Sequence, residues 1–176
     1  MTEIVIRDYN ERDAPSVGRL IADTYRQYNL DFLPAGEQGP FLGPFEHAHS
    51  PDPAHQAAVA QVIRSEWVYV AERVSETIGA GFGAAEIVGV LRGREERLGS
   101  LFVRGDCQRQ GIGRALVEHF ERVSREQGVR VIRVAATLYG LPFYLAMGYK
   151  RSTGVRTSWS FQGHGLPIQP MRKVLT

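Results

Sequence analysis

The strongest constraint on the fold is a loop with two glycines that joins a predicted strand to a predicted helix. β-Branched and aromatic residues predict the strand over residues 98–103. The helix is predicted over residues 113–127 from apolar side chains at helical spacing, namely Leu116, Val117, Phe120 and Val123. Gly111 and Gly113 allow the backbone to approach a ligand closely, and a helix start carries a partial positive charge. The segment therefore predicts an anion-binding site at the start of the helix.

Arg109 and Arg114 favour a phosphate-bearing ligand, because guanidinium groups bind phosphate oxygens through paired hydrogen bonds. A Walker loop needs Gly-Lys followed by Ser or Thr, which this loop lacks. A dinucleotide fingerprint needs a third glycine where Leu116 stands and an acid at the end of the next strand, where residues 135–137 are Ala-Ala-Thr. The loop is therefore expected to hold a diphosphate, but neither a Walker-bound nucleotide nor NAD.

Charge is divided unevenly along the chain, although the net charge is only +2. Residues 1–100 contain 9 basic and 15 acidic side chains, whereas residues 101–176 contain 12 basic and 4 acidic ones. This division favours a protein that brings an anionic ligand to a cationic one, although a solvated surface can give the same division. The sequence shows no dense basic stripe and no nucleic-acid-binding motif, so we expect no nucleic-acid partner.

Length and composition predict one globular domain over residues 1–176. Hydrophobic residues make up 43% and charged residues 23%, which excludes collagen-like, coiled-coil and wholly disordered chains. The single cysteine, Cys107, has no partner for an internal disulfide, and Glu3 places an acid where a signal peptide would be basic. We therefore expect a reducing cytoplasm. Apolar runs such as residues 87–91 are only strand-sized, so no membrane span is expected.

The order of elements follows from periodicity and turn residues. Strands are predicted over residues 3–10, 67–71, 86–92, 98–103, 129–136, 149–161 and 168–175. Helices are predicted over residues 13–28, 53–63, 113–127 and 139–147. A glycine-rich connection is expected over residues 75–85, and residues 29–53, rich in Pro, Gly and aromatic residues, are expected to form a long functional loop.

The glycine loop resembles the acetyl-CoA loop of the GCN5-related N-acetyltransferases. That family's pattern is Gln or Arg, two variable residues, Gly, one variable residue, then Gly or Ala, and residues 108–113 read Gln-Arg-Gln-Gly-Ile-Gly. The resemblance extends over residues 86–150, through Leu101-Phe102-Val103 before the loop and through Phe143-Tyr144 and Gly148-Tyr149 after it.

The resemblance implies a fold, an activity and a set of binding residues. The fold would be α/β, a mixed and mostly antiparallel sheet of six or seven strands flanked by about four helices. The activity would be direct transfer of acetyl from acetyl-CoA to a primary amine of a small, cationic molecule. In the family, the strand before the loop splays from its neighbour and its backbone pairs with the pantetheine arm. The implied cofactor-binding residues are Leu101, Phe102, Val103, Gln108, Arg109, Gln110, Gly111, Ile112, Gly113, Arg114 and Thr137.

Tyr144 is the catalytic residue that the resemblance implies, because the family tyrosine at this position lies beside the sulfur and protonates the departing thiolate. Without the resemblance, a core aromatic would be the simpler interpretation. The general base is left open. Residues 98–103 contain no acid, so a water-relayed path to Glu72, Glu66 or another carboxylate of the N-terminal half is one alternative. Thr137 stands where the family often has an asparagine that binds pantetheine.

The acceptor is expected to contact residues 29–57, the second helix and residues 153–165, which flank the thioester in this fold. Asp31, Glu37 and Glu46 would suit a cationic acceptor. Two rival functions remain open: a protein lysine or N-terminal acetyltransferase, and a non-catalytic acyl-CoA-binding sensor. A homodimer is compatible with the resemblance, since dimers are common in the family.

Several other His, Cys and charged side chains are not expected to take part in catalysis or metal binding. The cluster of His47, His49 and His55 is interpreted as exposed loop chemistry rather than a metal site. Cys107 is interpreted as loop packing or surface, not as a nucleophile. Solvated positions are expected at His119 and along the helix face formed by Glu118, Glu121, Arg122 and Arg125.

Overall fold

The computed structural model describes residues 2–75 and 85–176, so that residues 76–84 of the predicted glycine-rich connection lie outside the described residues. The strands are β1 (Thr2–Asp8), β2 (Trp67–Ser75), β3 (Ala85–Arg94), β4 (Arg97–Val103), β5 (Val131–Thr137), β6 (Lys150–Arg151), β7 (Arg156–Ser160) and β8 (Gly163–Val174). The α-helices are α1 (Ala14–Thr24), α2 (Gly39–Leu42), α3 (Pro53–Ile63), α4 (Ile112–Glu126) and α5 (Leu141–Ala146). Among the described residues, no helix is both long and apolar enough to cross a membrane.

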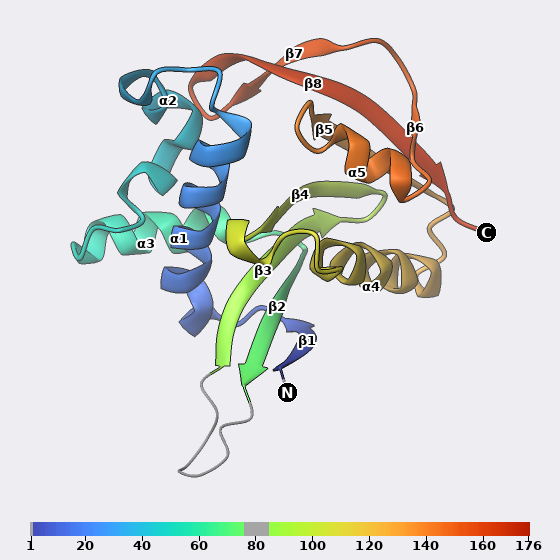
Figure 1. Ribbon diagram of the computed structural model, residues 1–176, viewed down its shortest axis with the longest axis horizontal. Helices are drawn as coiled ribbons and strands as arrows, with labels where there is room; N and C mark the ends of the chain where they lie inside the picture. The colour runs from blue at the N-terminus through green and yellow to red at the C-terminus, as the bar shows by residue number, and fades with distance from the viewer. Residues whose placement is uncertain (1, 76–84) are drawn as a thin grey trace.

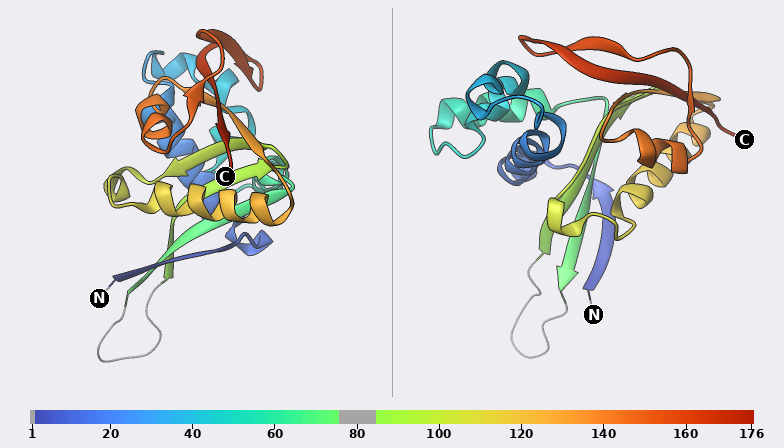
Figure 2. Two further views of the ribbon diagram at one scale, coloured as in Figure 1. Left: turned by 90° about the vertical axis from the view of Figure 1, so that its right-hand side faces the viewer. Right: turned by 45° about the horizontal axis from the view of Figure 1, so that its top comes forward.

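The strands form one mixed sheet in the order β1-β2-β3-β4-β5-β8-β6, with β7 also paired to β8. Only β4 and β5 pair in parallel among the described strands, and the other pairs are antiparallel. Helices α1 and α3 cover one face of the sheet, and α4 and α5 cover the other (Figures 1 and 2). This is the α/β architecture predicted from the sequence.

Each face of the sheet has its own hydrophobic core. On one face, α4 places Leu116, Val117 and Phe120 against the sheet with their side chains fully buried. On the opposite face, a second cluster joins α1, α3 and the segment between them, and includes Phe45. Burying large apolar side chains on both faces fixes the sheet between the two helix layers.

Two local predictions differ from the structure. The predicted loop over residues 29–53 contains three helical turns, η3 (Ala35–Glu37), α2 and η4 (Gly43–His47), because apolar residues such as Phe41, Leu42 and Phe45 turn inward and are buried. The predicted strand over residues 149–161 is divided into β6 and β7, which brings the strand number to eight. The chain bends between these two short strands, and each pairs separately with β8.

Candidate active site

Strands β4 and β5 separate after only two paired positions. Arg97 pairs with Arg133 and Leu98 pairs with Val134, and the parallel ladder ends there. Beyond that point β4 pairs only with β3, up to Val103, while β5 pairs only with β8. The backbone of residues 101–103 therefore has an edge without a strand partner, as the splay implied by the resemblance requires.

A cavity of about 690 Å³ opens at this separation. Its volume lies within the range of about 300–1,000 Å³ that small-molecule sites occupy. The lining includes Leu101, Phe102, Val103, Gln108, Arg109, Gly111, Ile112, Gly113, Arg114, Thr137 and Tyr144. The structure thus gathers every predicted site residue except Gln110 around one cavity.

The loop before α4 presents backbone N–H groups as a cluster. Gly111 has φ +85° and Arg109 has φ +63°, both in the left-handed region. Within the described chain, no hydrogen bond is formed by the backbone N–H groups of residues 109–114, whereas the backbone N–H of Ala115 donates to the carbonyl of Gly111. Free N–H groups at a helix start, together with the helix dipole, bind anions such as a diphosphate.

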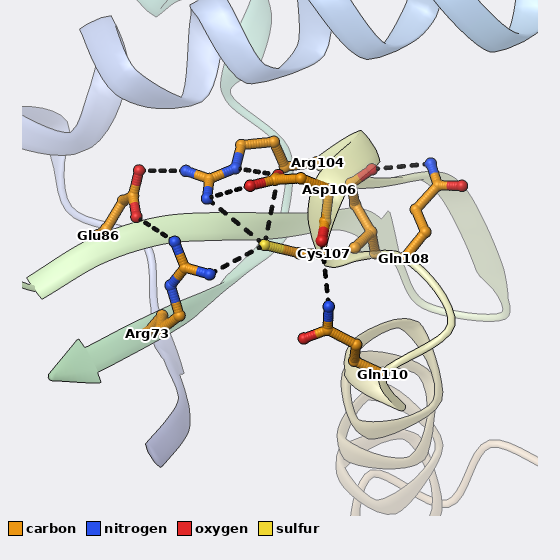
Figure 3. Close-up of polar contacts among 8 residues, drawn as sticks. Arg73, Glu86, Arg104, Asp106, Cys107, Gln108 and Gln110 are labelled. Carbon is orange, nitrogen blue, oxygen red and sulfur yellow. Dashed lines mark hydrogen bonds and ion pairs between the residues drawn. The ribbon is translucent and has the colours of Figure 1, made fainter. Parts of the chain in front are cut away.

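Side-chain amides hold this loop against the end of β4 (Figure 3). Gln108 donates from Nε2 to the carbonyl of Val103 at 3.0 Å, and Gln110 donates from Nε2 to the carbonyl of Asp106 at 3.0 Å. The hydroxyl of Tyr139 donates to Oε1 of Gln108 at 2.6 Å. The Gln110 side chain therefore bonds within the loop and does not line the cavity, whereas its backbone N–H belongs to the cluster before α4.

Cys107 is fully buried in the same loop, which confirms the prediction that it packs there. Arg73 of β2 and Arg104 both approach its Sγ, at 3.4 and 3.5 Å, and both also bond to Glu86 of β3 (Figure 3). Burial raises the pKa of the Cys107 thiol, so the group stays protonated and serves as packing. Arg104 also forms an ion pair with Asp106 at 2.6 Å within the loop, while its contact with Glu86 ties the loop start to the sheet.

Tyr144 projects from the short helix α5 into the opposite side of the cavity. The residue is 6% exposed and lines the cavity, and its hydroxyl forms no hydrogen bond with the described residues. Its ring packs edge-on against Phe143 and Tyr149, with centroids 5.1 and 5.5 Å apart. Burial raises the pKa of Tyr144 well above its ordinary value, so the phenol keeps its proton at neutral pH. It can act as a proton donor.

These features agree with a comparison against protein-family models. A model described as an acetyltransferase (GNAT) domain matches residues 45–175. The chain belongs to the GNAT family. It is therefore an acetyl-CoA-dependent N-acetyltransferase, and the free amides of residues 109–114 provide donors suited to the diphosphate of coenzyme A.

Solved structures support the GNAT fold. A GCN5-related N-acetyltransferase from Rhodopseudomonas palustris aligns with a TM-score of 0.70 at 21% identity, over 97% of this chain and 95% of that chain. PaiA N-acetyltransferase from Thermoplasma acidophilum, solved in complex with coenzyme A, aligns with a TM-score of 0.67 at 14% identity, over 98% of this chain and 99% of that one. A comparison with curated proteins gave no match.

The far end of the GNAT cavity is built from elements that are distant in the sequence. Tyr25 directly follows α1, and its hydroxyl donates to Oγ of Ser160 on β7 at 2.7 Å. Thr137 at the end of β5 donates to Oδ1 of Asn29 at 2.6 Å, which joins the two sides of the cavity. The predicted acceptor segments contribute Asn29, Phe45 and residues 158–161, whereas α3 contributes nothing to the lining.

Arg92 and Ser100 also line this end, and both were missed in the sequence. Arg92 on β3 stands directly opposite Ser100 on β4 in the antiparallel ladder. Sequence reasoning treated both as ordinary strand residues. The only available signal was that the charged Arg92 directly follows the apolar run 87–91.

No Asp, Glu or His side chain from the described residues lines the cavity. Glu72 is held in ion pairs with Arg7, which also binds Asp13, and the hydrogen bond from Arg7 lowers the pKa of Glu72. Glu66 lines a separate hollow beside Tyr9. The acids expected to face a cationic acceptor, Asp31, Glu37 and Glu46, are exposed and lie outside the lining. None of these carboxylates is placed to receive a proton directly from an acceptor in the cavity.

Two side chains of α4 that were predicted to be solvated, Glu121 and His119, are at least partly buried in the structure. Glu121 is buried, with 3% of its area exposed, because Lys173 near the end of β8 covers it and donates to its carboxylate at 2.8 Å. His119 is half-buried against the ring of Tyr69, and burial lowers the pKa of His119.

The three histidines near α3 are held in local contacts. His49 pairs with Asp23 at 2.7 Å, and His55 contacts the hydroxyl of Ser50 at 2.7 Å. The rings of His47 and His55 stack with centroids 4.2 Å apart. Among the residues described, no group of three or more His, Cys, Asp or Glu side chains is arranged to hold a metal ion.

Proposed function

We propose that this enzyme transfers acetyl from acetyl-CoA directly to a primary amine of a small molecule, with residues 1–176 acting as one catalytic domain. The observation that carries the proposal is the single cavity, which begins at the free amides before α4, passes between β4 and β5, and ends among side chains from α1, β3 and β7. Both reactants can meet there without a covalent enzyme intermediate.

The coenzyme end uses mainly backbone groups. The amides of residues 109–114 and the guanidinium groups of Arg109 and Arg114 would bind the diphosphate. The unpaired edge of Leu101, Phe102 and Val103 would bind the pantetheine arm as an added strand would. Thr137 would contribute its hydroxyl from the facing strand.

Tyr144 would act as the general acid that protonates the departing thiolate. Its buried phenol lines the cavity and keeps its proton, and no neighbouring group of the described chain competes for that proton. The amine must lose a proton before it attacks, because an alkyl amine with a pKa near 10.4 is mostly charged at pH 7. With no carboxylate or imidazole from the described residues in the lining, solvent in the cavity would receive that proton.

The sequence predicts a cationic acceptor on account of Asp31, Glu37 and Glu46, but these acids lie outside the lining, so the proposal needs no cationic group beyond the reacting amine. A small acceptor is favoured over a protein chain because Tyr25, Phe45, Ser160 and Phe161 converge on the acceptor end. Tyr25 is hydrogen-bonded to Ser160, and the ring centroids of Phe45 and Phe161 lie 6.0 Å apart. Side chains this close to one another leave a lining suited to a compact molecule.

The test is thiol release from acetyl-CoA in the presence of polyamines, aminoglycosides, amino acids and peptides. Turnover with a small amine supports the proposal. Faster turnover with peptides would identify a protein acetyltransferase instead. Binding of acetyl-CoA without turnover by any acceptor would identify an acyl-CoA sensor.

A further inference from the structure

Arg92 is a cation without an anionic partner at the acceptor end of the cavity. Its Nε donates to Oγ of Ser100 at 2.9 Å, and its Nη1 donates to the carbonyl of Val62 at 2.6 Å. Its Cζ lies 5.7 Å from the ring centroid of Phe45. The remaining terminal nitrogen, Nη2, has no hydrogen-bond partner among the described residues. These contacts fix the guanidinium in place and leave a donor available.

Other partly buried cations of this chain are paired with carboxylates. Arg7 binds Asp13 and Glu72, and Lys173 binds Glu121. Arg92 has no such pair in the part of the chain that the structure describes, and burial lowers the pKa of Arg92. A guanidinium group nevertheless keeps its charge in proteins. Because a buried charge without a partner is costly, an anion from outside the chain is the natural complement.

The position of Arg92 separates it from the coenzyme end. In the β3–β4 ladder, Arg92 stands opposite Ser100, whereas Gly89 stands opposite Val103, next to the phosphate-binding loop. At about 3.3 Å per residue, three positions along the strand correspond to roughly 10 Å. Its contacts with Phe45 and Val62 place Arg92 on the α1–α3 side of the sheet, whereas α4 covers the other side (Figure 2).

The polar groups beside Arg92 at this end are hydroxyls, and no carboxylate from the described residues lines the cavity. Tyr25 and Ser160 form a hydroxyl pair that lines the same end, and the charge of Arg92 partly offsets the rise in pKa that burial imposes on Tyr25. Ser100 adds a third hydroxyl. Tyr25 donates its proton to Ser160, and Ser160 donates its own to the carbonyl of Phe41 at 2.7 Å, so the hydroxyl of Ser100 is the one left to donate. Together with Nη2 of Arg92 it suits a carboxylate, which accepts hydrogen bonds at both of its oxygens.

We propose that Arg92 binds a carboxylate of the acceptor, so that the acceptor is a small amino acid or a related amine that also carries a carboxylate. This inference rests on the proposed acetyl transfer and names its substrate class. The carboxylate would anchor the molecule on the α1–α3 side and direct its amine toward the gap between β4 and β5. Phe45 and Phe161 in the lining favour an apolar side chain on that acceptor.

The decisive comparison uses the wild-type enzyme and matched acceptors. Leucine, phenylalanine and 4-aminobutyrate are each compared with the corresponding carboxamide and with the amine that lacks the carboxylate, by thiol release from acetyl-CoA. We expect kcat/KM for at least one amino acid to exceed that of its two analogues by about 10- to 150-fold, the range for a hydrogen bond to a charged group. Equal or faster turnover of the carboxylate-free amines would overturn the inference while leaving the proposed function intact.

Two variants test whether the preference for carboxylate-bearing acceptors depends on Arg92. Arg92→Met keeps an unbranched apolar stem in place of the arginine stem and removes the guanidinium charge, so it should reduce the preference for the amino acid to within about twofold and leave acetyl-CoA affinity unchanged. Arg94→Met, an exposed arginine of the same strand outside the cavity lining, should leave all constants unchanged. An equal loss for all acceptors in Arg92→Met would instead indicate a structural role. Should Arg92→Met fail to fold, the wild-type comparison still decides.

A binding measurement distinguishes failure of the proposed carboxylate site from failure of the proposed acetyl transfer. The same compounds are titrated calorimetrically into the wild-type protein saturated with coenzyme A. Binding of an amino acid but not its carboxamide, without turnover, would support the carboxylate site and contradict the proposed transfer. No binding and no turnover with any carboxylate-bearing amine would overturn the carboxylate site.

Discussion

The two ends of the cavity are built in different ways. The coenzyme end is one continuous stretch of chain, residues 101–114, and it presents backbone amides and an unpaired strand edge. The acceptor end is assembled from side chains of α1, β3, β4 and β7 and of Tyr25, which follows α1; Arg92 and Ser160 are among them. Backbone donors bind any ligand of the right shape and charge, whereas assembled side chains determine which acceptor enters. Coenzyme binding therefore depends mainly on the backbone, whereas the choice of acceptor depends on the side chains of this particular protein.

The largest effect is expected where the two ends meet, at Tyr144. Tyr144→Phe removes the proton donor and should lower kcat by about 10²–10⁴, the range for a lost general acid, while the Kd for acetyl-CoA stays the same. Its hydroxyl makes no hydrogen bond with the described chain, so the variant should fold normally. Tyr149→Phe is the matched control, because Tyr149 is also buried but does not line the cavity. Equal losses in both variants would show that packing, not proton donation, explains the effect.

The raised pKa of Tyr144 also predicts how the activity changes with pH. An acid whose pKa is raised stays protonated beyond its ordinary value near 10, so Tyr144 should cause no fall in activity up to that pH. kcat/KM should instead rise with pH as the amine loses its proton. A descending limb between pH 8 and 10 that disappears in Tyr144→Phe would contradict the account.

A smaller effect is expected from the side chains of the coenzyme end, because its backbone amides remain in every variant. Arg109→Gln and Arg114→Gln should each raise the Kd for coenzyme A by about 10-fold, with the preference among acceptors unchanged. Arg130→Gln, an exposed arginine outside the cavity, serves as the control. Calorimetric titration of coenzyme A measures all three. A changed acceptor preference would show that the two ends are not independent.

At the acceptor end, Tyr25→Phe removes the hydroxyl that bonds to Ser160. We expect the KM for the acceptor to rise about fivefold, in keeping with one neutral hydrogen bond, and the KM for acetyl-CoA to stay constant. Tyr9→Phe is matched, since its hydroxyl is also buried but lies outside this cavity. A rise in the KM for acetyl-CoA alone would contradict the assignment of Tyr25 to the acceptor end.

The smallest expected effect concerns the link between the ends. Thr137→Ala and Asn29→Ala each break the same 2.6 Å hydrogen bond, and each should lower the free energy of unfolding by about 1 kcal/mol. Thr137 Oγ1 also accepts from the N–H of Gly140 at 3.3 Å, so Thr137→Ala should lose somewhat more than Asn29→Ala, and the double variant should lose less than the sum of the two. Additive losses in denaturant titrations would show that the two side chains act separately.

The sequence predicted the coenzyme end well because that end is local. Arg109 and Gly111 lie two positions apart in the loop between a strand and a helix, and both have a positive φ. Their contribution to anion binding follows from that local order of strand, loop and helix. The same applies to the overall fold, whose strand and helix order follows from periodicity. The prediction that Glu121 is solvated was wrong for a different reason. Helical spacing alone placed it on an exposed face, whereas in the structure β8 brings Lys173 over it.

The acceptor end was largely hidden in the sequence because it depends on tertiary contacts. Asn29 meets Thr137 across 108 positions of sequence, and Tyr25 meets Ser160 across 135. Nothing in the local pattern around Arg92 distinguishes a buried cation without a carboxylate from an exposed one. Such features become visible only when the sheet brings β3, β4 and β7 beside α1.

The most direct test of the two-ended cavity measures two constants, the Kd for coenzyme A and the KM for the preferred acceptor, in Arg109→Gln and in Arg92→Met. The account predicts that Arg109→Gln raises only the Kd for coenzyme A and that Arg92→Met raises only the KM for the acceptor. Parallel changes of both constants in both variants would contradict it.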